Sequence, residues 1–267
     1  MMHSLWLTNM TDKIIKISDD FWNIRGEFRV FGLLNIGTQA SLVKRGNGKF
    51  VLLDAYTFQD DIKQQVDALT NNGADIEAII NLHPFHTLHV AKAHSYYPQA
   101  KLYGTQRHLE KFPELPWQVE LSNSNEFAAL FSDDFEFSVP RGVDFISNNE
   151  QLHFSSVLAY HITSKTIHVD DTLMFLKLPG LLGVLKSPEL SFHMTLSKTL
   201  ERRKGAANDF RLWVAQIAEQ WCDAEVLCAA HSHILIVKNE SPSIAAMIMT
   251  ALQREEKTLR HHQKRYG

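Results

Sequence analysis

The chain is poor in several features that mark particular classes of protein. It has two cysteines, Cys222 and Cys228, among 267 residues, so it cannot be held together by a disulfide framework. We expect both to serve as small apolar core residues in a reducing compartment. No apolar run reaches the roughly 20 residues of a membrane-spanning helix, and the first residues lack the basic and apolar stretches of a signal peptide. These absences favour a cytoplasmic protein that does not bind membranes.

The chain also lacks an excess of positive charge. It carries 27 Lys and Arg against 30 Asp and Glu, a formal net charge of -3. The sequence therefore does not predict the basic surface with which proteins bind nucleic acids. Hydrophobic residues make up 45% of the chain, which is typical of a folded protein. Without repeats or an obvious linker, we expect a single domain over 1–267, with its core at about 28–235 and a C-terminal helix at about 243–265.

Strand-like and helix-like segments alternate in the first half of the chain, which favours an α/β fold. Asn47-Gly48 predicts a hairpin turn between two β-rich runs. The nearly continuous apolar run at 76–81 suits a strand that is buried on both faces. We expect strands at 28–33, 39–44, 49–53, 76–81 and 101–103, and helices at 58–71, 90–97 and 106–111.

The second half is more difficult to interpret, and 114–143 shows no clear pattern. An aromatic stripe on the expected helix at 206–221 predicts a core-facing side. The basic stretch 253–267 is expected to be a solvated helix end rather than a partner site. The apolar segment 176–184 predicts either a loop beside the substrate or the contact of a homodimer. We expect strands at 143–146, 151–154, 156–161, 166–169 and 225–228, and a further helix at 244–252.

Histidine is abundant by contrast, with 14 residues. His83, His86 and His89 lie within seven residues of sequence, directly after the expected strand at 76–81. Ligands bind at the carboxyl ends of strands in α/β sheets, and imidazole is a good ligand for zinc and iron. The sequence therefore predicts a metal site on this loop.

Three more residues of the same kind follow along the chain. His153, Asp171 and His231 each stand at or just after an apolar, strand-like run. Residues at the ends of several strands can meet at one edge of a layered fold. We therefore expect them to join the histidine loop around a shared metal ion.

This ordered set resembles the metallo-β-lactamase superfamily. Members carry a His-x-His-x-Asp-His loop after a strand, and then a His, an Asp and a last His at strand ends. The run KFVLLDA, which ends in Asp54 and Ala55, resembles the family's early strand with a terminal Asp. The resemblance implies a four-layer αββα sandwich. The implied ligands are His83, His86 and His153 for a first metal ion, and His89 and His231 for a second, with Asp171 bridging the two.

The loop departs from the family pattern at two places. Pro84 and Phe85 separate the first two histidines, where the family has one residue, and Leu88 stands where the family has its Asp. Asp170 is the rival of Asp171 for the bridging role. Neighbouring residues of a strand point to opposite faces, so we expect only one of the two to be a ligand.

The resemblance also implies a chemistry. In that family a metal-bound hydroxide attacks a carbonyl or phosphoryl centre. We expect hydrolysis of a small-molecule ester, lactone or thioester, with one or two zinc ions or else iron, and with Asp171 and His231 as catalytic residues. Two alternatives stay open: an iron-dependent oxidoreductase on the same fold, and a non-catalytic protein with a remnant site. Asp54 is expected to orient a ligand histidine, whereas His168 is expected to be an ordinary strand residue.

Overall fold

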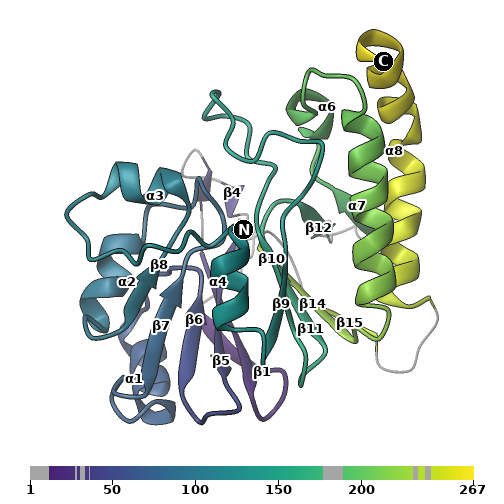
Figure 1. Cartoon of the computed structure of the whole chain (residues 1–267). Helices are drawn as coiled ribbons and strands as arrows, with labels where there is room; N and C mark the ends of the chain where they lie inside the picture. Colours follow the sequence, from purple (N-terminus) through teal and green to yellow (C-terminus); the bar gives the residue numbers. More distant parts are fainter. Residues whose placement is uncertain are drawn as a thin grey trace, which may run out of the picture.

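Two β-sheets face each other, and helices cover the outer side of each sheet (Figure 1). This arrangement comes from a computed structural model that describes residues 12–27, 29–30, 34–35, 37–176, 189–230, 234–237 and 242–267. The first sheet has the strand order β1 (Lys13–Lys16), β2 (Phe21–Gly26), β5 (Thr38–Lys44), β6 (Phe50–Leu53), β7 (Ile76–Ile80) and β8 (Lys101–Tyr103). The second has the order β15 (Ile234–Ile236), β14 (Val226–Ala229), β11 (Thr166–Val169), β10 (Leu158–His161) and β9 (Phe135–Ser138).

Two short strand pairs and the helices complete the described elements. Strand β3 (Arg29–Val30) pairs with β4 (Leu34–Asn35), and β12 (Leu173–Leu176) pairs with β13 (Glu189–Phe192). The helices are α1 (Asp60–Leu69), α2 (Val90–Tyr96), α3 (Gln106–Lys111), α4 (Asn125–Leu130), α6 (Leu196–Thr199), α7 (Ala206–Gln220) and α8 (Ile244–Tyr266). None of the helices that the structure describes has the length and apolarity needed to cross a bilayer.

Alternate residues of the strands face different layers. In β6, Leu52 packs with Ile62 and Val66 of α1 on the outer side of the first sheet. Its neighbours Val51 and Leu53 belong to the apolar cluster between the two sheets. A third cluster joins the outer side of the second sheet to α7 and α8. The expected four-layer αββα sandwich is therefore confirmed.

Most elements with a strong sequence pattern form where they are expected. The hairpin at Asn47-Gly48 joins β5 to β6, the buried apolar run forms β7, and the aromatic stripe of α7 is buried. The expected strands at 143–146 and 151–154 are wrong. Val143 forms only an isolated bridge to Leu200, beside which the Asp144 N–H donates to the Thr199 carbonyl, and the Leu152 N–H donates locally to the Asn149 carbonyl.

Other differences are local. The unpatterned stretch contains α4, which Ser124 caps by accepting from the Phe127 N–H, and then β9. Cys228 is buried in β14 as expected, but Cys222 is exposed because it follows the end of α7. The helix expected at about 243–265 forms as α8. Apart from Leu176, the apolar segment 176–184 lies outside the described residues.

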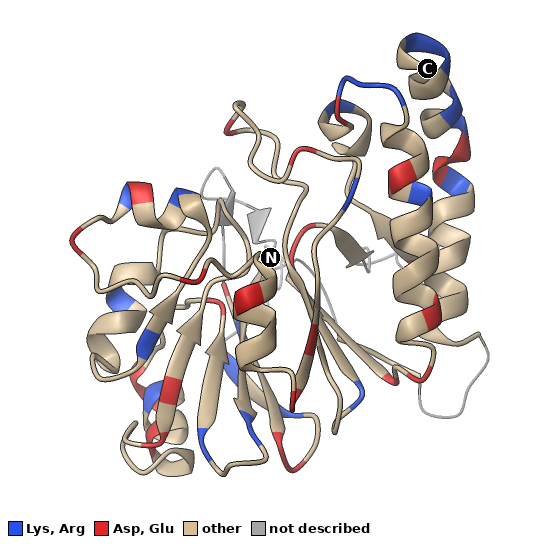
Figure 2. Cartoon of the chain, in the orientation of Figure 1, with Lys and Arg blue, Asp and Glu red and all other residues tan. Residues whose placement is uncertain are grey.

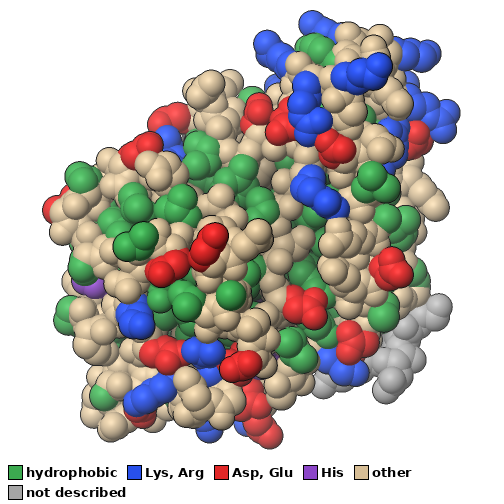
Figure 3. Space-filling model, viewed as in Figure 1, with side chains coloured by type: hydrophobic (Ala, Val, Ile, Leu, Met, Phe, Trp, Pro, Cys, Tyr) green, Lys and Arg blue, Asp and Glu red, His purple; other side chains and the backbone are tan. Residues whose placement is uncertain are grey.

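Charged side chains are unevenly spread over the surface. Basic and acidic residues mix along the turns and helices at the lower end of the molecule in Figure 2. Around α6 and the C-terminal end of α8, basic residues predominate (Figures 2 and 3). The net charge of -3 therefore conceals a local concentration of positive charge.

The first prediction concerns the α7 layer. Phe210 is 0% exposed and Leu212, on the same helix, is 56% exposed. We expect Phe210→Ala to lower the free energy of unfolding by about 3–5 kcal/mol, because it removes buried apolar surface and leaves a cavity. Leu212→Ala is the matched control and should change it by less than about 0.5 kcal/mol. Urea unfolding of both variants measures the difference, and equal effects would contradict this packing.

The second prediction concerns acid stability. His161 is buried against Phe21 and Phe135, with Nδ1 2.8 Å from Ser164 Oγ. Burial lowers the pKa of His161 to about 4, whereas an unfolded chain leaves it near about 6.5. Between these values the unfolded state binds the extra proton, so stability falls as the pH falls.

We therefore expect the variant His161→Gln to lose less stability than the parent between pH 7 and pH 4.5, by about 2 kcal/mol. Urea unfolding at the two pH values measures this. Parallel losses in parent and variant would show that His161 does not contribute to acid sensitivity.

Candidate metal centre

The candidate site lies where parallel strands end. Strands β6 and β7 run parallel in the first sheet, and β11 runs parallel to β14 in the second. Asp54 follows β6, His83 and His86 follow β7, and Asp170 and Asp171 follow β11. We call these five residues the rim. Because strand ends on both sheets contribute to it, the rim brings together side chains that are far apart in sequence.

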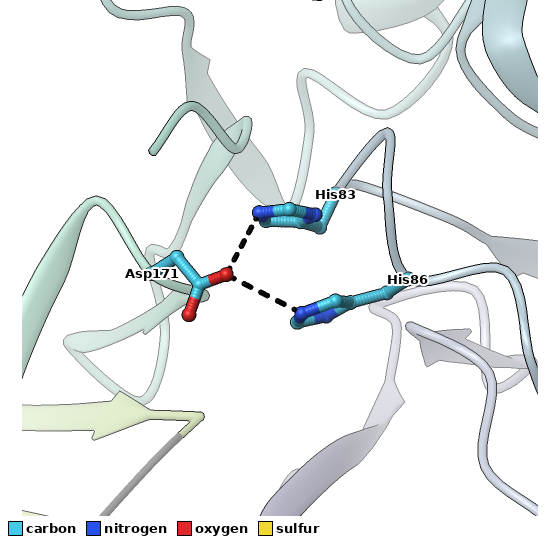
Figure 4. A group of neighbouring side chains, drawn as sticks. All are labelled: His83, His86 and Asp171. Atoms are coloured by element: carbon cyan, nitrogen blue, oxygen red, sulfur yellow. Dashed lines mark ion pairs between the residues drawn. The ribbon is translucent and has the colours of Figure 1, made fainter. Parts of the chain in front are cut away.

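His83, His86 and Asp171 point toward one another (Figure 4). Asp171 Oδ2 lies 3.1 Å from His83 Nε2 and 3.5 Å from His86 Nε2, and the two imidazole rings stack at 3.9 Å. Their potential ligand atoms all lie within 4.8 Å of one another. His83 Nε2 is buried and makes no hydrogen bond of good geometry, although the carboxylate is close. Two imidazoles, one carboxylate and an unsatisfied buried nitrogen fit a zinc or iron ion.

Asp170 and Asp171 both contact His86. Asp170 Oδ2 lies 2.8 Å from His86 Nδ1, on the ring edge opposite to Asp171. The alternation expected of neighbouring strand residues does not apply, because β11 ends at Val169 and Asp171 has a φ of 46°. A carboxylate that accepts from the second ring nitrogen is typical of a metal-binding histidine, whose ring it orients.

Asp54, His168 and Asp170 form a second cluster, which is joined to the first through the contact of Asp170 with His86. His168 is fully buried; its Nε2 lies 2.9 Å from Asp54 Oδ2 and its Nδ1 lies 2.9 Å from Ser41 Oγ. Asp54 also accepts a hydrogen bond from the Leu82 N–H at 2.8 Å. Every ring nitrogen of His168 thus has a partner. The cluster is best described as a satisfied buried network that supports the rim, so His168 is more than an ordinary strand residue.

Sequence reasoning missed Arg25 and Gln39, two buried residues of the first sheet that reach across to the second. Gln39 Nε2 donates to Asp170 Oδ1 at 2.9 Å and to the carbonyl oxygens of Val169 and Cys228. Arg25 donates to Gln39 Oε1 and to the Ala229 carbonyl. One sequence feature could have identified them: polar residues occur at alternate positions of otherwise apolar strands, so one face of each strand is polar.

Charge balance sets the protonation of the rim. Burial alone lowers the pKa of His86, but the carboxylates of Asp170 and Asp171 overcome it and raise that pKa well above its ordinary value. Burial would raise the pKa of Asp170, but His86 and His168 hold it well below its usual range. Without a metal ion, His86 is therefore a cation between two anions. A metal ion held by these residues would replace that positive charge, and its binding would release a proton.

For His83, burial outweighs the neighbouring carboxylate in setting the pKa. Burial and the nearby His86 lower its pKa to about 4, against the raising effect of Asp171. The neutral ring accepts a hydrogen bond from the Phe85 N–H at Nδ1, which places its proton on Nε2. Coordination through Nε2 therefore requires that this proton move to Nδ1 and that the Phe85 contact change.

Two other described residues of the predicted site, His89 and His153, are not members of this group of three. His89 Nδ1 lies 2.8 Å from Thr57 Oγ1. The ring of His153 stacks on Phe85, 6.1 Å from the ring of His83, and its Nε2 contacts the Glu150 carbonyl oxygen. Leu88 is 74% exposed. His231 lies outside the described residues. The ligand roles of His89, His153 and His231 stay predictions.

Solved structures with a similar arrangement of elements include metallo-β-lactamases. DIM-1 metallo-β-lactamase exposed to ceftazidime has a TM-score of 0.59 and 14% identity, covering 92% of this chain and 97% of that one. The enzyme from Pontibacter korlensis gives 0.55 and 12%, covering 91% and 99%. The enzyme from Erythrobacter litoralis with β-mercaptoethanol in its active site gives 0.57 and 13%, covering 94% and 96%.

No family model and no curated protein matches the chain by sequence. The likeness is therefore one of architecture, with strands, helices and their order shared over more than nine tenths of both chains. The chain has the metallo-β-lactamase fold.

Proposed function

We propose that this protein is a metal-dependent hydrolase of a small-molecule ester, lactone or thioester. The observation that carries the proposal is the convergence of His83, His86 and Asp171, whose ligand atoms lie within 4.8 Å of one another. These residues lie at strand ends of a fold shared with metallo-β-lactamases. Function depends on such a site rather than on the fold alone.

The three residues would hold a zinc ion through two imidazole nitrogens and one carboxylate oxygen. Catalytic zinc sites use three protein ligands and keep one position open. When bound, such an ion lowers the pKa of a water molecule and polarises the carbonyl oxygen of a substrate. His89, His153 and His231 are the further residues that we propose for a more complete site or a second ion.

The residues around the site position its ligands. Asp170 accepts from His86 Nδ1 and so fixes the ring with Nε2 directed at Asp171. Gln39 in turn holds Asp170. Asp171 presents Oδ2 to both imidazoles, so that oxygen would be the metal ligand. The second oxygen of the carboxylate is the atom that we propose shares or accepts a proton at the reacting centre. His231 is proposed as the second catalytic residue from the sequence pattern alone.

The choice of an acyl substrate rests on two supports. The similar structures are named β-lactamases, and opening a β-lactam is also an attack on a carbonyl carbon. The chain is slightly acidic overall, which favours a small molecule over a nucleic acid.

A second candidate function uses the same residues. Two histidines and one carboxylate also form the ligand set of non-haem iron enzymes, so an iron-dependent oxidoreductase is the alternative. A remnant site that binds no metal is the third outcome. Metal analysis separates the three.

The third prediction tests the ligand set. We expect elemental mass spectrometry to find near-stoichiometric zinc in protein that is purified without added metal. It should also hydrolyse at least one of a nitrophenyl ester, a lactone and an acyl thioester. We expect His86→Ala and Asp171→Asn each to remove most of the metal and to lower hydrolysis at least 100-fold. His94→Ala is the control, since His94 is a buried residue of α2 outside the candidate group.

Iron in place of zinc, with no hydrolysis, would favour the oxidoreductase. Absence of any metal in the parent protein, or full metal content in both ligand variants, would refute the hydrolase proposal.

The fourth prediction concerns Gln39. The variant Gln39→Leu removes donors from Asp170 and from two buried carbonyl groups. We expect it to lower the free energy of unfolding by about 2–4 kcal/mol and to weaken zinc binding about 10–100-fold. Urea unfolding and competition with a chromogenic chelator measure the two effects.

Gln65→Leu is the matched control, because Gln65 is exposed on α1 and its amide donates to the carbonyl of Asp61 on the same helix. It should alter neither quantity. Lower stability with unchanged zinc affinity would mean that Gln39 only ties the sheets together and does not position the ligands.

A further inference from the structure

A large cavity lies beside the last turns of α8, and none of its lining residues is a candidate metal ligand. Its volume is about 780 Å³, which lies within the range of small-molecule sites. Three segments that are far apart in sequence form its walls: the 149–152 stretch, the 195–202 stretch around α6, and α8. It is lined by Asn149, Gln151, Leu152, Thr195, Ser197, Lys198, Leu200, Arg202, Lys257, Thr258, His261, His262, Arg265 and Tyr266.

The lining is strongly basic. Four cationic side chains, two histidines and no carboxylate contribute to it. The cations are Lys198, Arg202, Lys257 and Arg265. Figure 3 shows Lys and Arg side chains gathered on this part of the surface. In a chain with a net charge of -3, such a concentration of one sign costs repulsion unless an anion offsets it.

Neighbouring arginines show that carboxylates are present nearby but pair elsewhere. Arg203 pairs with Glu201 and Asp209, and Glu256 of α8 pairs with Arg211 and Arg260. Within the part of the chain that the structure describes, by contrast, no carboxylate forms an ion pair with any of the four cations of the cavity. Most of the local acidic residues thus pair with arginines outside the cavity. The exception is Asp144, which lies close enough to Arg202 for the two charges to interact, so the lining keeps three cations without such a neighbour among the described residues.

The remaining lining residues indicate the kind of anion. Thr195, Ser197 and Thr258 bring hydroxyl groups, and Asn149 and Gln151 bring amides, all of which can donate hydrogen bonds. Leu152, Leu200 and Tyr266 add apolar surface. Arg and Lys side chains with hydroxyl donors suit phosphoryl oxygens, and the apolar wall suits an organic group attached to them.

We propose that this cavity binds a small organic molecule that carries two or more phosphoryl groups. None of its lining residues is a candidate metal ligand, although Leu152 directly precedes His153, and the proposal does not require the hydrolase function. Its position also changes the interpretation of the basic C-terminal stretch. One side of that stretch is a wall of a binding cavity, rather than only a solvated helix end.

The fifth prediction tests this site by calorimetry with two probes, inorganic pyrophosphate and adenosine diphosphate. Both should bind saturably at one site per chain, with the nucleotide at least as tight because it also contacts the apolar wall. The double variant Arg202→Glu/Lys257→Glu should weaken both at least tenfold. Raising the salt concentration should weaken binding, as expected for charge-dominated contacts.

The matched control is Lys13→Glu/Lys44→Glu, which changes the net charge equally at two exposed residues of β1 and β5. Its affinities should stay within twofold of the parent. A second control, His86→Ala measured with a chelator present, should retain binding, which separates this site from any metal centre. Circular dichroism melting confirms that each variant is folded.

Three results would overturn the proposal: no saturable binding of either probe, equal loss in the control double variant, or loss on His86→Ala. A single-stranded oligonucleotide that binds the same residues more tightly than the nucleotide would also overturn it, in favour of a nucleic-acid site.

Discussion

The structure depends on how buried negative charge is balanced at the rim. Asp54, Asp170 and Asp171 are all at most 3% exposed, and an unpaired buried carboxylate is costly by several kcal/mol. His86 lies between Asp170 and Asp171, and His168 contacts Asp54. These contacts explain the pKa directions of His86 and Asp170, whereas burial dominates those of Asp54 and His83. A metal ion bound there would replace the positive charge that the proton on His86 supplies.

The same constraint accounts for polar residues inside the sandwich. Gln39 and Arg25 occupy inward-facing strand positions where apolar side chains would pack, yet their donors reach Asp170 and the carbonyls at the ends of β11 and β14. The two sheets are thus cross-linked at the end that carries the site. Asp54 and Asp171 also adopt positive φ angles of 58° and 46°. Such strain, together with buried charge, is typical of functional sites rather than of a core chosen for stability.

The sequence was sufficient to predict the layers of the fold and the loop of the site, but not the hydrogen bonds and ion pairs that connect the site residues. The apolar periodicity of α1 and α7 and the apolar run that forms β7 were sufficient to predict these elements. Each pattern lies within one segment and reflects which side chains of that segment are buried. Gln39 could not be assigned a partner, since its bonds depend on which strand of the other sheet lies opposite. The position of His153 depends on the irregular segment after Ser147, where side-chain bonds replace a ladder, and no period in the sequence describes such a segment.

The fold can be predicted from sequence patterns, whereas the distribution of charge on the surface cannot. A layered core tolerates many simultaneous apolar substitutions when its total volume and pattern are kept, so 14% identity is compatible with the architecture shared with DIM-1 metallo-β-lactamase. The effect of surface charge, by contrast, depends on where each charged side chain lies. A net value of -3 sums over all faces, whereas an anion responds only to the cations within about a Debye length, roughly 8–10 Å. The basic cavity beside α8 is therefore invisible to composition, and it becomes evident only when Arg202 and Lys257, which are distant in sequence, line one space.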